Sequence, residues 1–357
     1  MTEEKSVPMS VLSALPSVGE ITHPAVVEAL RKKMLEMVHL PPEGPTKLYP
    51  GTLPSLMTEL DLEQLQDMHS DHVASFRLAG QRMMLYCFTQ NMMERMILAD
   101  LHHQHLKYIT NVVVDPDIWK GTILDGVYLE KEKRFVVHDC RMGRGLSLAE
   151  PGDGECDYTE RIDAIKIVLS TWKFYGADGF KVVTHHFGAM SDLPWMSRVF
   201  SMPNPVEPKT GFPVQGLVIW NVTPPYRYGR ATDIVAWKAK REAEFRLRVH
   251  NDDSTRADLL ALKTMQKAIV LGQISTAGLL PDASSVDKKI VTCCFVDGKW
   301  VPVRIRSDRL YPDTVGRVRQ LETDYFSLAD FFGRPSAAAG AEAGPAAPAA
   351  DSSVTIA

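Results

Sequence analysis

The stretch Phe76-Arg77-Leu78-Ala79-Gly80-Gln81-Arg82 joins two apolar segments through a glycine. Val73 and Phe76 precede that glycine, and the run Met-Met-Leu-Tyr-Cys-Phe at 83–88 follows it. Two strands on either side of a tight glycine turn would form a hairpin, with Arg77 at the mouth of the resulting sheet. An arginine in that position could bind a phosphate. The simpler alternative is an ordinary hairpin with surface arginines.

Length, charge and cysteine content limit the class of protein. The chain has 357 residues, of which 45% are hydrophobic and 24% charged, and its formal net charge is −4. This length suggests two domains that each bury a core. The charge argues against a strongly basic, non-specific nucleic-acid binder, although it leaves room for a local basic groove. The five cysteines show no CxxC pairing, which favours a reduced intracellular protein without a structural zinc.

Apolar periodicity and turn residues predict a mixture of helices and strands in the first part of the chain. A helix is expected from Pro24 to Val38, because a proline suits the first turn and the apolar residues share a face. Thr58 with Asp61 is typical of a helix cap, and Thr159 is expected to cap a later helix. Strands are expected at 110–114, at 121–129 with a turn at Asp125-Gly126, and at 135–140, 180–184 and 217–222.

The run Ala-Trp-Lys-Ala-Lys-Arg at 236–241 is expected to end the first domain. Residues 245–249 then predict a strand, 257–271 a helix, and 290–305 a hairpin around Asp297-Gly298. From Pro335 onward the chain is mainly Ala, Gly, Pro and Ser, which predicts disorder. The pattern alone therefore predicts an α+β domain followed by a small β-barrel.

Two further features concern metals and membranes. The cluster His102-His103-Gln104-His105 lacks the i,i+4 pairing and the nearby ligands of a metal site, so we predict no metal there. No run of about 18 apolar residues occurs, so we expect no membrane-spanning helix.

Six short elements occur in an order typical of one family. They are Tyr49-Pro50-Gly51, Arg77 to Arg82, Leu124-Asp125-Gly126-Val127 with Val137-His138-Asp139, Gln215-Gly216-Leu217-Val218, Tyr226 to Gly229 with Ala236-Trp237-Lys238, and Trp300 with Arg304-Ile305-Arg306-Ser307-Asp308-Arg309. In this order, roughly residues 45–325 resemble the guanylyltransferase module of eukaryotic and viral mRNA capping enzymes. The DNA and RNA ligases share the central elements. The opening Tyr-Pro-Gly and the terminal Arg-Ser-Asp-Arg favour the capping branch.

The resemblance implies a fold, a domain order and a site. The fold would be α+β, a ligase-type and ATP-grasp-like nucleotidyltransferase domain with antiparallel sheets at 45–244 and an OB-fold barrel at 245–333. A helical extension at 1–44 would precede them, and a disordered tail at 334–357 would follow. Arg77 would occupy the nucleophile position. The implied nucleotide-binding residues are Arg82, Asp125, His138, Val218, Lys238, Arg306, Asp308 and Arg309.

Several residues depart from the family's pattern. The family's lysine attacks the α-phosphate of GTP, whereas Arg77 stands here, and a guanidinium stays protonated to about pH 12 and offers no lone pair. Ala79, Val127 and Gln215 replace carboxylates that serve the sugar and the metal in the family. In addition, Ala236 replaces a lysine, and His138 replaces an aromatic residue that stacks on guanine. We therefore predict that no covalent guanylate forms.

The leading prediction is a guanylyltransferase-like protein of the 5′ mRNA capping pathway that is catalytically impaired. It would act by binding GTP, a triphosphate or capped RNA 5′ end, or a capping partner protein. One alternative is an active GTP–RNA guanylyltransferase with an atypical nucleophile, which would need Mg or Mn. Another is a structural subunit of an RNA-processing complex. By the resemblance we expect an intracellular, nuclear protein without a membrane partner.

Overall fold

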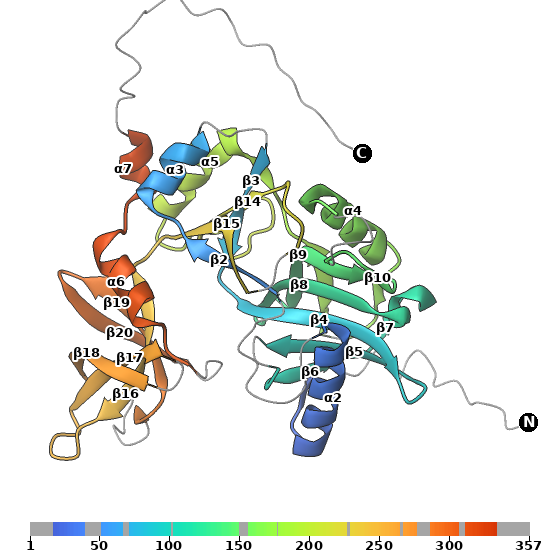
Figure 1. Ribbon diagram of the computed structural model, residues 1–357, viewed down its shortest axis with the longest axis horizontal. Helices are drawn as coiled ribbons and strands as arrows, with labels where there is room; N and C mark the ends of the chain where they lie inside the picture. Colours follow the sequence, from blue (N-terminus) through green and yellow to red (C-terminus); the bar gives the residue numbers. More distant parts are fainter. Residues whose placement is uncertain are drawn as a thin grey trace, which may run out of the picture.

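The computed structural model describes residues 17–39, 51–66, 71–100, 103–149, 156–176, 178–226, 229–264, 267–276, 286–306 and 311–333. Their strands form one eight-stranded sheet, two five-stranded sheets and a two-stranded sheet. The fold is thus mixed α/β with mainly antiparallel sheets. Two sheets with their helices make up the larger part of the molecule, and strands β16 to β20 form a separate lobe beside it (Figure 1).

The eight-stranded sheet has the order β1-β6-β5-β4-β8-β9-β10, with β12 parallel to β9. Its strands are β1 (Val18–Ile21), β4 (Gln81–Gln90), β5 (Met93–Asp100), β6 (Leu106–Ile109), β8 (Thr122–Leu129), β9 (Arg134–Gly143), β10 (Leu146–Ser147) and β12 (Lys181–Thr184). A small sheet joins β7 (Val112–Val113) to β11 (Lys173–Phe174). The strand predicted at 110–114 is therefore only two residues long.

The apolar run of β4 is continuous because both of its faces are covered. Met84 and Tyr86 pack with α2 (Pro24–Met37), whereas Met83 and Leu85 belong to the core that contains α4 (Tyr158–Leu169). Neighbouring side chains on a strand point to opposite faces. A strand between two layers must therefore be apolar at both its odd and its even positions. The helix predicted from Pro24 is confirmed.

The second sheet has the order β13-β3-β14-β15-β2. Its strands are β2 (Thr52–Leu56), β3 (His72–Leu78), β13 (Gly188–Ala189), β14 (Val214–Asn221) and β15 (Gly229–Lys238), the last parallel to β2. Helices α3 (Glu59–Gln66), α5 (Leu193–Arg198) and α7 (Leu328–Gly333) contribute to the core on one face, together with Phe76, Leu217 and Trp237. The side chains of alternate residues lie on the other face.

The predicted hairpin at Gly80 is wrong, because β3 and β4 belong to different sheets. Gly80 lies where the chain crosses from the second sheet to the eight-stranded one. A Cβ atom on Gly80 would lie 2.5 Å from the backbone oxygen of Tyr128 and 2.5 Å from Cγ1 of Val127. Glycine is required there for close packing against β8, and the two strands it joins diverge instead of pairing.

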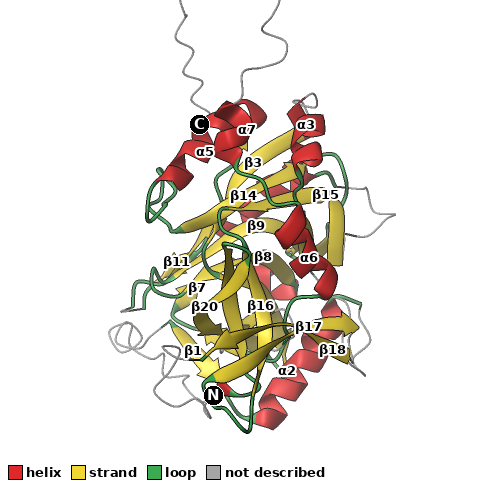
Figure 2. Cartoon of the chain, turned by 90° about the vertical axis from the view of Figure 1, so that its left-hand side faces the viewer, coloured by secondary structure: helices red, strands yellow, loops and turns green. Residues whose placement is uncertain are grey.

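The third sheet has the order β18-β17-β16-β19-β20. Its strands are β16 (Glu242–Val249), β17 (Arg256–Thr264), β18 (Lys267–Ser275), β19 (Ile290–Val296) and β20 (Lys299–Arg306), and helix α6 (Val315–Thr323) packs on them through Val318 and Leu321. Figure 2 shows this sheet in front, with α6 above it. The hairpin predicted at 290–305 is confirmed. The pairings between described strands do not join β18 to β20, so a closed OB barrel is not confirmed.

The helix predicted at 257–271 is wrong, since this segment forms β17 and most of β18. Ala257, Leu259 and Ala261 are fully buried, and they occur at every second position. That period of two is the period of a strand, and pairing with β16 supplies the backbone hydrogen bonds.

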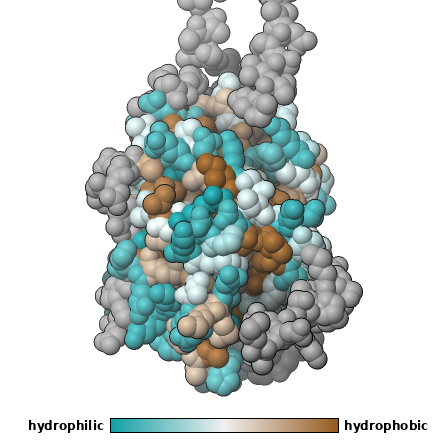
Figure 3. All heavy atoms as spheres, turned by 90° about the vertical axis from the view of Figure 1, so that its right-hand side faces the viewer, coloured by the Kyte–Doolittle hydropathy of each residue, from teal (hydrophilic) through white to brown (hydrophobic). Residues whose placement is uncertain are grey.

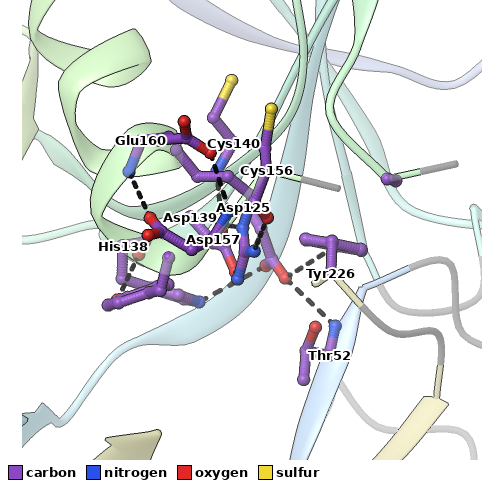
Figure 4. Close-up of polar contacts among 12 residues, drawn as sticks. Thr52, Asp125, His138, Asp139, Cys140, Cys156, Asp157, Glu160 and Tyr226 are labelled. Atoms are coloured by element: carbon purple, nitrogen blue, oxygen red, sulfur yellow. Dashed lines mark hydrogen bonds and ion pairs between the residues drawn. The ribbon is translucent and has the colours of Figure 1, made fainter. Parts of the chain in front are cut away.

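Local turn and cap signals gave mixed results. The Thr58–Asp61 cap is confirmed, since the backbone N–H of Asp61 donates to the Thr58 hydroxyl oxygen at 3.2 Å and the N–H of Thr58 donates to Asp61 Oδ2 at 2.6 Å. Asp157, not Thr159, caps α4, in a reciprocal box with Glu160 (Figure 4). The turn expected at Asp125-Gly126 is absent, because both residues lie inside β8. A Cβ atom on Gly126 would lie 2.5 Å from the oxygen of Val136 on the neighbouring strand.

The described residues give no sign of a metal cluster or a membrane span. No group of three or more His, Cys, Asp or Glu among them could hold a metal ion, and His102 lies outside them. None of the described helices is long and apolar enough to cross a membrane. On the face shown in Figure 3, hydrophobic residues form separate patches among hydrophilic ones. The tail predicted from Pro335 lies outside the described residues.

Candidate functional site

One row of three residues crosses the second sheet. Gly216 on β14 pairs with Arg77 on β3 and with Lys238 on β15. Residues paired in this way point to the same face of a sheet, and the outer two backbones are about 10 Å apart across two strand spacings. Gly216 carries no side chain between them, and a Cβ atom there would lie 2.0 Å from the oxygen of Trp237. The row therefore brings a guanidinium and an amine to one face.

A cavity of about 290 Å³ lies over this row. Arg77, Arg82 and Lys238 line it, as do His138 and Val218, so the structure brings together five residues that the sequence assigned to the site. Residues that the sequence analysis missed also line it, including Ser75, His185, Trp220, Asp313 and Arg317. The cavity thus combines cations from the sheet with residues that follow the third sheet in sequence.

Arg82 is bound to a carboxylate at the cavity wall. Its Nε and one terminal nitrogen each lie 2.8 Å from an oxygen of Asp125, and the same terminal nitrogen donates to the carbonyl of Thr52. Asp125 is fully buried and also accepts from Thr52 N and from the Tyr226 hydroxyl, both at 3.3 Å (Figure 4). Asp125 does not line the cavity. It holds Arg82 in place and compensates its charge.

The opposite wall has a different charge environment. Lys238 Nζ donates to the carbonyl of Glu242 at 2.8 Å. Burial, followed by the positive charges of Arg317 and Arg77, lowers the pKa of Lys238 to about 7. Asp313 and Glu244 oppose this shift but do not outweigh it. Near neutral pH a substantial fraction of this lysine is therefore an uncharged amine.

His138 lies at the apolar end of the cavity. Its ring is 5.2 Å from that of Trp220, and Trp220 is stacked on Tyr158. His138 is 2% exposed, and its Nε2 has no hydrogen-bond partner within the described structure, with Asp125 Oδ1 at 3.6 Å. Burial, followed by the charge of Arg82, holds the pKa of His138 well below its ordinary value. A neutral ring, whose unused Nε2 is itself buried, thus lies beside Trp220 at this end of the cavity.

A larger cavity of about 790 Å³ adjoins the first one and shares Arg77, Arg82 and Lys238 with it. Its further lining comes partly from the third sheet and includes Lys240, Glu242, Arg304 and Arg306. Arg306 forms an ion pair with Glu244, with a nitrogen–oxygen distance of 2.7 Å. The two cavities together offer room for a ligand longer than the first cavity alone can hold.

The remaining predicted residues have other places. Asp308, Arg309 and the Tyr49-Pro50 pair lie outside the described residues. Asp139, part of a quoted element, is buried in an ion pair with Arg161 of α4 at 2.8 Å. Gln215, which stands at a family carboxylate position, donates its side-chain amide to the carbonyl of Leu78 at 2.9 Å. The Asp139–Arg161 pair joins β9 to α4 and is not part of the cavity lining, whereas Gln215 joins β14 to β3 and lines both cavities.

The missed residues differ in the signal that could have found them. Trp220 follows Val218 by two positions on one strand, so the period of two places both on the same face. Arg317 and Asp313 carry no such local signal. They reach the cavity because the chain returns from the third sheet to α6, and only the tertiary fold brings them there.

The donor atoms do not fit a divalent metal ion. Val127 and Gln215, which line the first cavity, carry no carboxylate, and Asp125 is engaged by Arg82. Magnesium prefers oxygen ligands, chiefly carboxylates and phosphates. Among the described residues, no group of three or more His, Cys, Asp or Glu could hold a metal ion here.

No family model and no curated protein matches the chain. Among solved structures it is similar to a mycobacterial DNA ligase D complexed with ATP and MES, at 11% identity over 72% of this chain and 95% of that one, with a TM-score of 0.40. A Lig E DNA ligase is 11% identical over 72% of this chain and 98% of that one, with a TM-score of 0.34. The ATP-dependent DNA ligase of bacteriophage T7, complexed with ATP, is 9% identical over 71% of this chain and 80% of that one, with a TM-score of 0.32. Likenesses this weak assign neither a family nor an activity. None of these three proteins is a capping enzyme.

Proposed function

We propose that this protein binds a nucleoside triphosphate, or the triphosphate 5′ end of an RNA, in the cavity over the Arg77–Gly216–Lys238 row. The observation that carries this proposal is the convergence of Arg77, Lys238 and Arg317 on a single cavity. Each arrives from a different element, and the charges of Arg77 and Arg317 oppose that of Lys238. A bound polyphosphate would relieve that repulsion.

The chemistry of the two ends of the cavity suits a nucleotide. Charge-assisted hydrogen bonds from arginine to phosphate contribute about 1.5–3 kcal/mol each. At the other end, His138, Trp220 and Val218 form a largely apolar pocket in which a flat base can stack.

The resemblance to capping guanylyltransferases makes GTP the expected nucleotide and 5′ mRNA capping the expected pathway, with a nuclear location. It also makes Arg77 an inert replacement for the family's nucleophile. A homologue that acts by binding GTP, an RNA 5′ end or a capping partner follows from these two points. An active transferase with an atypical nucleophile is the second candidate, and the placement of Lys238 in the same cavity favours it.

Calorimetry and thermal melting with GTP and with a short 5′-triphosphate RNA test the proposal. We expect both ligands to raise the melting temperature. Arg77→Ala and Arg317→Ala should each weaken binding by about tenfold or more, the loss of one charge-assisted contact. Arg319→Ala is the matched control, because Arg319 also lies on α6 but is 64% exposed and pairs with Glu322.

Arg82 is not a suitable probe of binding, because its loss would leave Asp125 buried without its cation. If neither ligand binds at millimolar concentration, the nucleotide-binding proposal fails. The third sheet and the surface around it would then carry the function, as expected for a structural subunit of an RNA-processing complex.

A further inference from the structure

Two acidic residues that are bonded to each other line different cavities. Asp313 lines the first cavity, and Glu244 lines the second. The N–H of Glu244 donates to Asp313 Oδ2 at 3.0 Å, and the N–H of Asp313 donates to the carbonyl of Glu244 at 2.7 Å. Glu244 belongs to β16, and Asp313 directly precedes Thr314, the N-cap of α6. These backbone contacts fix both acids at the place where the two cavities adjoin.

Each of the two acids holds an arginine. A terminal nitrogen of Arg306 lies 2.7 Å from Glu244 Oε1, and Nε of Arg317 lies 3.4 Å from Asp313 Oδ1. Arg306 lines the second cavity, and Arg317 lines the first. The Arg306–Glu244 pair is the closer and the less exposed of the two, with 17% and 9% of its side chains accessible. Solvent and salt therefore screen it less than a pair on the open surface.

The path of a bound nucleotide leads from the apolar end of the first cavity towards Arg306. Arg77 and Lys238 line both cavities, so a phosphate chain that passes these two residues enters the second cavity. A monophosphate is too short to continue far beyond them, whereas a triphosphate adds two further groups. A guanidinium binds phosphate and carboxylate through the same hydrogen-bond geometry. The distal phosphates and Glu244 would therefore compete for Arg306.

We propose that Glu244, and to a smaller extent Asp313, compete with the distal phosphates of a bound nucleoside triphosphate for Arg306 and Arg317. This inference rests on the nucleotide binding proposed above. The carboxylates are fixed by the backbone, so the guanidinium groups must leave them to reach the ligand. The apparent affinity is then reduced by the fraction of molecules in which the arginine is paired with its acid. The two acids thus weaken triphosphate binding and leave monophosphate binding unaffected.

Calorimetry on the full chain with GTP and with GMP tests this competition. Glu244→Gln keeps the size of the side chain and an acceptor oxygen but removes the charge. We expect the GTP affinity to rise about fivefold, as for the loss of one partly exposed ion pair, and the GMP affinity to stay within about twofold. Glu242→Gln is the matched control. Glu242 lies on the same strand and lines the same cavity but forms no ion pair with a described residue, so this variant measures the effect of charge alone.

A double-mutant cycle separates competition from simple repulsion of the phosphates. In an Arg306→Ala background the competing cation is absent, so Glu244→Gln should change the GTP affinity by less than about twofold. An equal rise in both backgrounds, or a rise of the same size in Glu242→Gln, would show that Glu244 acts only through its charge and would overturn the proposal. A fall in affinity would overturn it too, because Glu244 would then position Arg306 for the ligand.

Binding of GTP by the wild type distinguishes the two proposals. If the wild type binds GTP and Glu244→Gln binds it equally well, the competition proposal is overturned while nucleotide binding stands. If neither protein binds GTP at millimolar concentration, both fail. Melting curves show whether Glu244→Gln is folded. Should it not fold, Asp313→Asn with Arg317→Ala forms a second cycle, because asparagine keeps the acceptor for the N–H of Glu244. There we expect a smaller rise in GTP affinity, of about twofold, since that ion pair is longer and more exposed.

Discussion

The cationic side chains on the two walls of the cavity have different partners. On the β4–β8 wall, Arg82 is held by a fully buried carboxylate that accepts two hydrogen bonds from it. On the β3–β14–β15 wall, Lys238 donates to a backbone carbonyl and is surrounded by two arginines whose charges outweigh those of the nearby acids. The first cation is neutralised within the fold, whereas the second loses its charge near neutral pH. Sequence position alone makes both look like phosphate ligands.

The difference between the two walls also changes the electrostatic potential expected inside the cavity. Arg82 is compensated by Asp125, Lys238 is partly uncharged, and Arg317 lies 3.4 Å from an oxygen of Asp313, so nearby acids offset part of the positive charge around the cavity. An anion bound there would raise the pKa of Lys238 again, because it adds a nearby negative charge. Anion binding would therefore change the charge of Lys238 on the β3–β14–β15 wall, whereas Arg82 on the β4–β8 wall keeps its charge whether or not an anion is bound.

The largest expected effect concerns the compensated wall. Arg82→Ala removes the cation from the fully buried Asp125 and should lower the free energy of unfolding by about 3 kcal/mol. Urea denaturation followed by circular dichroism measures this change. Arg77→Ala, which leaves this pair intact, should cost far less. Equal losses in the two variants would show that the Arg82–Asp125 pair does not stabilise the fold.

The second effect concerns the opposite wall and its pH dependence. Between the folded pKa of Lys238, about 7, and its ordinary value of 10.5, the unfolded chain holds a proton that the folded chain has lost. The free energy of unfolding therefore rises with pH across this window, by up to about 1.4 kcal/mol per pH unit for one group. Lys238→Met should flatten the rise. Urea denaturation at pH 7, 8 and 9 tests this, and an unchanged slope in the variant would assign the dependence to another group.

The smallest effect concerns the apolar end, where two histidines can be compared. His138 Nε2 is unpartnered in the described structure, whereas both ring nitrogens of His185 lie 2.9 Å from backbone carbonyl oxygens. His138→Phe should therefore change stability by about 1 kcal/mol or less, and His185→Phe should cost more. Thermal melting compares the two variants.

The affinity of the His138→Phe variant for GTP gives a second test of the role of His138. If His138 only stacks on the base, the phenylalanine variant should bind GTP as well as the wild type does. A fall in affinity of about fivefold or more would show that the imidazole makes a polar contact with the base that a phenylalanine ring cannot make. A large loss of stability in His138→Phe would show that the ring has partners that its environment does not reveal.

The sequence by itself determined the features that depend on neighbouring residues. The helix from Pro24, the Thr58–Asp61 cap and the hairpin at 290–305 follow from periodicity, side-chain capping and a tight turn, each of which acts within a few residues. The ordered elements also selected residues, among them Arg77, His138 and Lys238, that line one cavity although they are far apart in the chain.

Only the tertiary structure decided which strands pair and which charges meet. Gly80 joins two sheets instead of turning a hairpin, because both flanking strands find better partners elsewhere in the chain. The pairing of Arg82 with Asp125, the arrival of Arg317 and the loss of charge at Lys238 all depend on contacts between distant segments. Electrostatic energy depends on distance and burial in space, which a linear pattern of residues does not contain.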